Sequence, residues 1–299
     1  MTTERTVPSG AWTELSEGVW VRQSRAYAMN SVVLIHDGHA VVIDPGVLPS
    51  EMDELSKFVT SRVPDFDRVA LIFTHPHWDH VLGKPWFPAA TLVAHVGFAD
   101  EIERDEADIE RKARAWIEGE GGEPWPTPFT HFVPDLQFRG TLGHTLGAFP
   151  LLSYDIPGHS ASQIALQFPE QGLFVSADTL SDIEIPWLDA PSWIHRKSLE
   201  AMQRVFEQET IETLVPGHGS IARGRTAVYQ RVVNDIAYLR RLEERVREAF
   251  ARGESKEATV AALESMDYLG KDAAYAMNDV HRENIRRTWQ GHQDRRHDG

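Results

Sequence analysis

The stretch LIFTHPHWDH, residues 71–80, joins an apolar run to three histidines and an aspartate. Three of the 14 histidines in the chain fall within these six positions, 75 to 80. Side chains alternate along an extended chain, so His75 and His77 would point the same way and could bind one ion together. Asp79 and His80 follow where the chain must turn, and they could serve a second ion. The ordinary alternative is a histidine-rich surface turn.

The composition limits the class of protein. The 299 residues are 41% hydrophobic and 25% charged, which is typical of a globular protein with a sizeable core. A net charge of −15 repels phosphate backbones, so we expect no nucleic-acid partner. The sequence has no cysteine, which excludes thiolate ligands and disulfides. It also lacks a signal peptide or an apolar run of about 20 residues, so we expect a cytoplasmic protein that does not contact membranes.

Strands and helices are predicted to alternate along the chain, which favours an α/β layered fold. Strand-like segments, rich in β-branched and aromatic residues, lie at 18–23, 31–44, 68–74, 91–96, 149–159, 162–178 and 213–219. Helical spacing is found at 49–62, about 99–118, about 192–208 and about 223–252, with two short helices expected over about 255–290. Ser50 is the predicted cap of the first helix.

The pattern of an apolar run that ends in a metal-capable residue recurs three times. LLSYDIPGH ends at His159, GLFVSAD ends at Asp178, and ETLVPGH ends at His218. Strand ends on one edge of a sheet converge in space, so these residues could meet those of the first motif. Five imidazoles and two carboxylates suit zinc, iron or manganese, and seven ligands are too many for one tetrahedral ion. This recurrence favours a metal site over a surface turn.

These residues resemble the metallo-β-lactamase superfamily over about residues 15 to 225. THPHWDH matches the H-x-H-x-D-H motif of that family, and the three later ligands match its remaining motifs in order. The resemblance implies an α/β, four-layer αββα sandwich with a C-terminal helical extension. We therefore expect a metallo-β-lactamase-like domain over 1–225, with an insert or lid at about 99–130, and a helical region over 226–299 that packs on it.

The resemblance also implies a ligand set for two divalent ions, with Zn²⁺ the first choice and iron or manganese the alternatives. His75, His77 and His159 would hold the first ion, Asp79, His80 and His218 the second, and Asp178 would bridge them. Asp44, in VVIDPG, resembles a family aspartate that supports the metal loop, although it could be a plain turn residue before Pro45. His144 lies in a similar GHT sequence, but we prefer His159 because no apolar strand is predicted to deliver His144.

The predicted chemistry is hydrolysis. Two ions that share a water lower its pKa toward neutrality, and the bridging hydroxide would attack an ester, lactone, thioester or phosphodiester. Asp79 would be catalytic, orienting that hydroxide or taking its proton. Asp178 and the lack of cysteine make the chain more similar to the glyoxalase II, lactonase and phosphodiesterase branches than to true β-lactamases. Lactonases of the family carry a tyrosine three positions after the bridging aspartate, and Ser181 at that position weakens the lactonase case. The alternatives are a mononuclear iron oxidoreductase that resembles persulfide dioxygenases, and a non-catalytic metal-binding protein.

Aromatic residues near the motifs predict the partner. Tyr27, Trp78, Trp187, Trp193 and His195 are candidate contacts for a small-molecule substrate, and an aromatic wall would suit a bulky apolar ester, lactone or thioester. The alternative is that these aromatic residues belong to the core and that His195 lies on a helix surface. An exposed apolar stripe in YLRRLEERVREAF, residues 238–250, could support a homodimer contact.

Overall fold

The computed structural model describes residues 12–268 and 271–297. The strands are β1 Trp12–Ser16, β2 Val19–Gln23, β3 Asn30–His36, β4 His39–Ile43, β5 Val69–Ile72, β6 Thr91–His95, β7 Leu136–Phe138, β8 Leu142–Leu146, β9 Phe149–Asp155, β10 Ile164–Phe168, β11 Leu173–Val175, β12 Thr213–Val215, β13 Ala222–Arg223, β14 Asp267–Tyr268 and β15 Lys271–Asp272. The α-helices are α1 Pro49–Thr60, α2 Trp78–Val81, α3 Phe98–Arg114, α4 Ser192–Gln208, α5 Arg225–Ala251, α6 Lys256–Leu263 and α7 Ala273–His297. Short 3-10 turns lie at Phe66–Arg68, Lys84–Trp86 and Pro169–Gln171, and a π-helical turn at Ala115–Glu120 follows α3. The predicted α/β class is confirmed.

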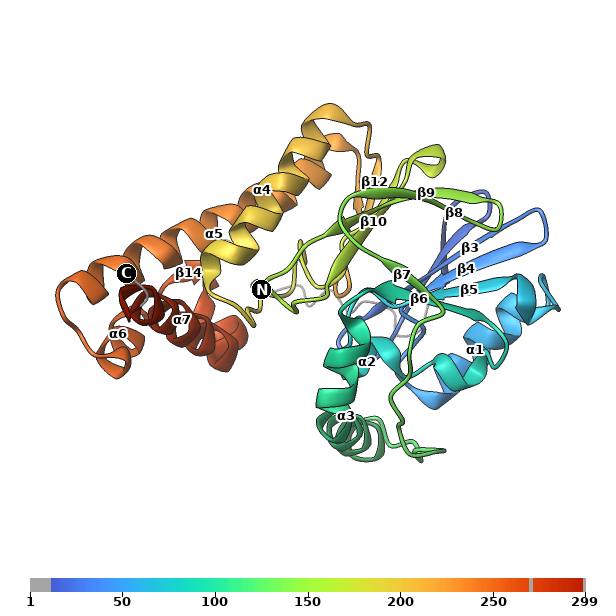
Figure 1. Cartoon of the computed structure of the whole chain (residues 1–299), viewed down its shortest axis with the longest axis horizontal. Helices are drawn as coiled ribbons and strands as arrows, with labels where there is room; N and C mark the ends of the chain where they lie inside the picture. Colours follow the sequence, from blue (N-terminus) through green and yellow to red (C-terminus); the bar gives the residue numbers. More distant parts are fainter. Residues whose placement is uncertain (1–11, 269–270, 298–299) are drawn as a thin grey trace, which may run out of the picture. The chain divides into compact units, whose positions relative to one another are not determined.

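The first compact unit, Met1–Tyr154 with Leu166–Gln171, contains a sheet of seven strands in the order β1 to β7. Its core lies between the sheet and the helices that pack on it. Figure 1 shows the strands β3, β4 and β5 of this sheet and the helices α1 and α3. Val42 and Leu71 of the sheet share one buried cluster with Met52 and Leu55 of α1 and with Ile102 of α3. The apolar residues on one face of these strands are therefore buried against α1 and α3.

The sheet changes from antiparallel to parallel pairing at β4, and this change positions the site. β3 and β4 form a hairpin closed by Asp37 and Gly38, both with positive φ (47° and 70°), as its tight turn requires. β4 pairs with β5 in parallel, with Ile43 opposite Ile72. The carboxyl ends of β4 and β5 therefore lie at the same edge, which brings the segment after Ile43 next to the segment after Ile72.

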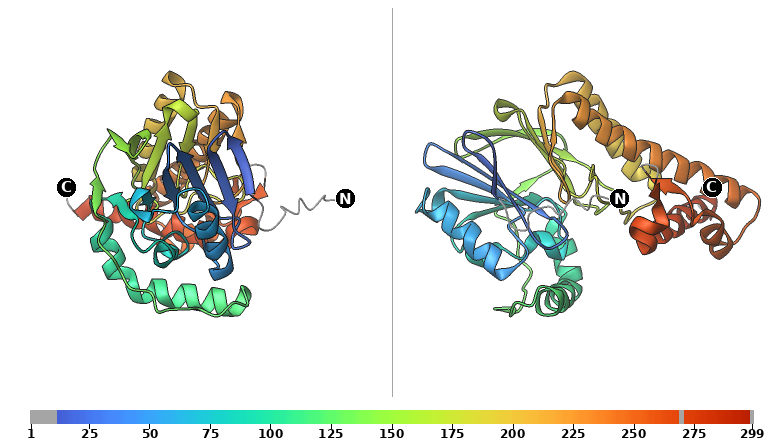
Figure 2. Two further views of the ribbon diagram at one scale, coloured as in Figure 1. Left: turned by 90° about the vertical axis from the view of Figure 1, so that its right-hand side faces the viewer. Right: turned by 180° about the vertical axis from the view of Figure 1, so that it is seen from behind.

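The second compact unit consists of Asp155–Ala165 and Gly172–Gly299. In it, β11 and β12 are parallel, with Val175 opposite Val215, so the loops after both strands leave from one edge. These strands belong to a sheet in the order β13-β12-β11-β10-β9-β8. α4 and α5 lie side by side and α7 also packs on α5, as Figures 1 and 2 show.

Two helix predictions were wrong in detail. α1 begins at Pro49 after Leu48 as its N-cap, and Ser50 lies inside the helix, where its hydroxyl donates to Glu123. The fixed φ of Pro49 suits the first helical position, so this helix starts without a serine cap. The tail holds one short helix, α6, and one long helix, α7, because α7 packs along both α5 and α6.

The apolar stripe of α5 is not exposed, contrary to the prediction. Tyr238, Leu239, Leu242 and Val246 are each 0% exposed, since this face of α5 packs on other helices of the same chain. A homodimer and the domain boundary near residue 225 stay predictions. Among the helices of the described residues, none has the length and apolar character needed to cross a membrane.

Candidate metal centre

The first motif forms a compact histidine cluster after β5. His75 and His77 lie in the extended segment that follows the strand, and the short helix α2 carries Asp79 and His80. The ring centroid of His75 is 4.6 Å from that of His77 and 4.2 Å from that of His80. His75 and His80 are fully buried and Asp79 is 7% exposed. Side chains of these polar types are rarely so buried unless they are paired or bind a metal.

Asp44 orients this cluster from the end of β4. One oxygen of its buried carboxylate accepts from the Thr74 backbone N–H (2.8 Å), and the other accepts from the Thr74 hydroxyl (2.6 Å) and from Nδ1 of His80 (3.0 Å). The Thr74 hydroxyl thus donates to Asp44, so at 3.0 Å it can only accept from Nδ1 of His75. Both rings therefore carry a proton on Nδ1, which leaves Nε2 as the nitrogen that could bind a metal ion. These hydrogen bonds agree with the predicted supporting role of Asp44, which stays a prediction.

The three later ligands meet at one carboxylate oxygen. Oδ2 of Asp178 lies 3.3 Å from Nε2 of His159 and 3.4 Å from Nε2 of His218. Two metal bonds of about 2.1 Å at a tetrahedral angle separate their ligand atoms by about 3.4 Å. The spacing of these three atoms therefore fits that of ligand atoms around a metal ion.

The loops that carry Asp178 and His218 are tightly constrained. Ala177 and Leu180, on either side of Asp178, both have positive φ (51° and 60°), a conformation that costs energy in residues with a side chain. The Gly217 backbone N–H donates to the Ala177 carbonyl at 2.6 Å. A Cβ atom at Gly217 would lie 2.0 Å from Oδ1 of Asp178, so this position has no room for a side chain. Our sequence analysis missed Gly217, although it directly precedes a predicted ligand.

His159 is held from behind by backbone. Its Nδ1 donates to the Trp187 carbonyl at 3.1 Å, which again leaves Nε2 as the nitrogen that could bind a metal ion. His195 packs beside this loop and is fully buried, so its expected position on a helix surface was wrong. Burial, and to a smaller extent the neighbouring His159, lower the pKa of His195 to about 3, so its ring is neutral at pH 7. A substrate contact by His195 stays a prediction, and its burial weighs against it.

Two residues of α5, both missed by our sequence analysis, tie down the loops of Asp178 and His218. Asp235 accepts from the Leu180 N–H (3.0 Å) and from the Tyr268 hydroxyl (2.6 Å). Arg231 donates to the carbonyls of Leu180 (3.0 Å) and Ser220 (3.1 Å). Burial raises the pKa of Asp235 to about 7, although both hydrogen bonds and Arg231 oppose this effect. The loop of Asp178 is therefore bound to α5 at Leu180, and the loop of His218 is bound to α5 at Ser220. Each contact lies two residues after the candidate ligand.

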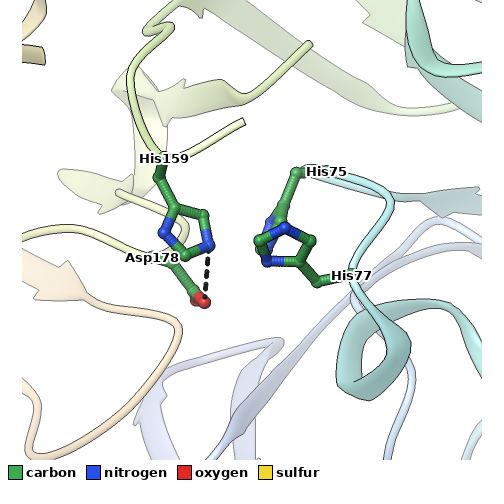
Figure 3. A group of neighbouring side chains, drawn as sticks. All are labelled: His75, His77, His159 and Asp178. Carbon is green, nitrogen blue, oxygen red and sulfur yellow. Dashed lines mark ion pairs between the residues drawn. The ribbon is translucent and has the colours of Figure 1, made fainter. Parts of the chain in front are cut away.

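Seven side chains form two groups in which each residue offers a ligand atom within 4.8 Å of the others. The first group is His75, His77, His159 and Asp178, which Figure 3 shows with the ion pair between His159 and Asp178. The second group is Asp79, His80 and His218. Neutral imidazoles and carboxylates without sulfur suit zinc, iron or manganese, so this donor set fits a metal site.

His144 belongs to neither group. It lies in β8, a strand in which only Leu146 is buried, so the expectation that no apolar strand delivers His144 is not contradicted. Its ring stacks on Phe138 with centroids 3.8 Å apart, and its Nε2 lies 3.1 Å from the Ser153 hydroxyl. Burial lowers the pKa of His144.

The aromatic residues predicted to contact substrate differ in exposure. Tyr27 is 49% exposed, and its ring lies 6.2 Å from Trp78 and 5.3 Å from Trp116, with all three in one aromatic cluster. Trp187 is 42% exposed. Trp193 is only 4% exposed, because it packs on α7 under the Arg295 guanidinium, and this position favours the alternative of a core residue. A substrate contact by any of them stays a prediction.

Solved structures share the fold at low sequence identity. A stereoselective inverting sec-alkylsulfatase from Pseudomonas sp. matches 94% of this chain with 15% identity and a TM-score of 0.72. This chain spans only 50% of the length of that enzyme. A metallo-beta-lactamase family protein from Thermus thermophilus matches 90% of this chain and 93% of its own, with 19% identity and a TM-score of 0.62. A metallo-beta-lactamase from Pontibacter korlensis matches 76% of this chain and 100% of its own, with 17% identity and a TM-score of 0.53.

The family itself is identified from the sequence match. No curated protein sequence matches the chain. A family model described as the metallo-beta-lactamase superfamily matches residues 26–218, a range that begins before Tyr27 and ends at the predicted ligand His218. The chain therefore belongs to the metallo-beta-lactamase superfamily.

Proposed function

We propose that this chain is a dinuclear metal-dependent hydrolase that cleaves an ester, lactone, thioester or phosphodiester of a small molecule. Members of its superfamily are mostly hydrolases. The observation that carries the proposal is the position of Asp178, whose Oδ2 lies 3.3 Å from Nε2 of His159 and 3.4 Å from Nε2 of His218. Because these two histidines belong to different ligand groups, one carboxylate oxygen can serve both ions.

The ions in this proposal are two Zn²⁺, with iron or manganese as alternatives. His75, His77 and His159 would hold one, Asp79, His80 and His218 the other, and Asp178 both. When bound, such ions act as Lewis acids and bring the pKa of water near neutrality. The hydrogen bonds at Nδ1 of His75, His80 and His159 support this assignment, because metal-binding histidines almost always donate their other ring N–H to a neighbour.

Asp79 is the proposed catalytic residue. The residue is 7% exposed and its Oδ2 lies 3.9 Å from Nε2 of His80, so it stands among the candidate ligands of the second group. From there its carboxylate would accept the proton of an attacking water and hold that water in line with the substrate. No serine or cysteine nucleophile is needed for this reaction.

The substrate we propose has an apolar part. Tyr27, Trp78 and Trp116 present an aromatic cluster, and Trp78 directly precedes Asp79 in the chain. Aromatic faces bind apolar groups with little loss of side-chain entropy. The net charge of −15 disfavours highly anionic polymers as substrates.

The test is a substrate panel with zinc-loaded protein. Aryl and alkyl esters, lactones, thioesters and phosphodiesters are assayed, with a secondary alkyl sulfate added because of the alkylsulfatase of similar fold. We expect hydrolysis of one class, and the loss of that activity in Asp178→Ala. Oxygen consumption with a persulfide and one iron per chain would instead favour the mononuclear oxidoreductase. Tight metal binding without turnover of any class would favour a metal-binding protein.

A further inference from the structure

The segment from Pro186 to Ala190 connects the candidate ligand His159 to the C-terminal helix α7. On one side, the Trp187 carbonyl accepts from Nδ1 of His159 at 3.1 Å. The backbone N–H groups of Asp189 and Ala190 both donate to the Gly158 carbonyl, at 2.7 and 3.2 Å. The residue before the ligand and the ring of the ligand are therefore bound to the same short segment.

On its other side, this segment is bound by one fully buried side chain of α7. The Asn284 amide accepts from the Leu188 N–H at 3.0 Å and donates to the Pro186 carbonyl at 2.6 Å. It therefore binds the backbone immediately before and immediately after Trp187. Its second N–H donates to the Tyr238 hydroxyl at 3.0 Å, which fixes the orientation of the amide from α5.

A second α7 residue continues this contact at the surface. Arg287 donates to the Asp189 carbonyl at 2.9 Å and pairs with the Asp189 carboxylate at 3.0 Å. The loop of His159, on the other side of this segment, is packed tightly, because a Cβ atom at Gly158 would lie 2.3 Å from His195. The position of the Trp187 carbonyl is thus set between α7 and the loop of His159.

We propose that Asn284 is a positioning residue for His159, acting through the Trp187 carbonyl. This inference rests on the proposed function, in which His159 is a metal ligand. The carbonyl keeps the proton of His159 on Nδ1, so that the lone pair of Nε2 points toward Asp178 and the ion. The family match ends at residue 218, so α7 supplies this support from outside the matched region.

The first test needs no variant and no metal. In metal-free protein at about pH 8.5, well above the ordinary histidine pKa of about 6.5, long-range proton–nitrogen NMR reports which ring nitrogen of each histidine is protonated. We expect His159 to carry its proton on Nδ1. A predominant Nε2–H form of His159 would overturn the proposal, whatever the protein binds.

The second test is the nearly isosteric variant Asn284→Asp. Its new oxygen would face the Pro186 carbonyl and could not donate, so the segment should shift and His159 should populate both neutral forms. Zinc affinity, measured by chelator competition, should fall by about 10–100-fold, the usual effect of removing an outer-shell partner of a metal ligand. The matched control is Thr288→Val, one turn along α7, where the fully buried hydroxyl makes no hydrogen bond.

The outcomes separate this inference from the function on which it rests. If Asn284→Asp folds like the control and keeps both the proton position and the zinc affinity, α7 is a packing element only and the proposal is wrong. If wild-type protein binds no zinc, the proposed function fails, while the NMR result still decides whether Asn284 positions His159. If the variant does not fold, the wild-type NMR result decides alone.

Discussion

The two parts of the candidate metal centre are built in opposite ways. Residues 74–80 place four ligands within six positions, supported by one carboxylate, Asp44, from the neighbouring strand. His159, Asp178 and His218 lie in three loops, each held by residues far along the chain. The first arrangement depends on local sequence and strand pairing, whereas the second depends on the packing of the helices α5 and α7.

This difference indicates where each part is vulnerable. In the first motif, His75 bonds to Thr74, and both Thr74 and His80 bond to Asp44, so substitutions at Thr74 or Asp44 should disturb it directly. The loops of the second part depend on Asp235, Arg231 and Asn284. Substitutions in helices well outside the motifs should therefore affect metal binding.

Removal of the shared ligand should have the largest effect. We expect Asp178→Ala to abolish turnover and to lose at least one ion per chain, because the variant leaves His159 and His218 without their common carboxylate. His144→Ala is the control, since that ring contacts Phe138 and Ser153 instead. Metal analysis of both proteins checks this, and full activity in Asp178→Ala would contradict the dinuclear account.

Gly217→Ala should disturb the same carboxylate without removing a ligand. The added Cβ would lie 2.0 Å from Oδ1 of Asp178, so the carboxylate or the loop must move. We expect activity and zinc affinity to fall by more than about 10–100-fold, the range for loss of an outer-shell partner. Gly119→Ala is the matched control because a Cβ there would contact nothing within 4 Å. Equal zinc affinities in the two variants would show that Asp178 tolerates displacement.

Asp44→Asn tests the local support of the first motif. The amide keeps the shape of the side chain but removes the charged acceptor 3.0 Å from Nδ1 of His80. We expect zinc affinity to fall by about 10–100-fold, with little change in fold. Asp37→Asn, an exposed carboxylate in the hairpin beside it, is the control. An unchanged affinity would mean that the motif orients His80 without Asp44.

The smallest effect on activity is expected for Asp235→Asn, which should change the pH dependence of stability. The pKa of Asp235 is raised from 3.8 to about 7 by burial, so the folded state binds its proton more tightly than the unfolded state. Its contribution to stability is complete below about pH 4 and is lost as the pH rises through about 7.

Urea unfolding of metal-free protein measures this contribution. We compare the free energies of unfolding of wild type and Asp235→Asn. The difference, wild type minus variant, should fall between pH 4 and 7 by a few kcal/mol at most, on the order of magnitude of the pKa shift. A difference that rises over this range would mean that the hydrogen bonds from Tyr268 and Leu180 outweigh burial.

The sequence predicted what depends on local pattern. Apolar runs that end at His159, Asp178 and His218 predicted both the strands and the residues that the structure gathers into ligand groups. It could not predict the support of those residues, because Asn284 lies 98 positions from Pro186 and Asp235 lies 55 positions from Leu180. Asparagine and aspartate within a polar helix look like surface residues until their partners are known.

The errors have the same physical origin. His195 and the stripe on α5 were expected at the surface, since helical periodicity shows which residues share a face but not what covers that face. The structure covers the α5 stripe with other helices of this chain, and His195 is buried beside the loop of His159. Ser50 failed as a cap because Pro49 already starts the helix one residue earlier.

The central claim is that seven side chains hold two ions that share Asp178. Elemental analysis of protein purified without added metal or chelator tests it most directly. We predict two divalent ions per chain in the wild type, mainly zinc, and at most one in Asp178→Ala. A single iron per chain in wild type, or no metal even after reconstitution with zinc, would contradict the dinuclear centre.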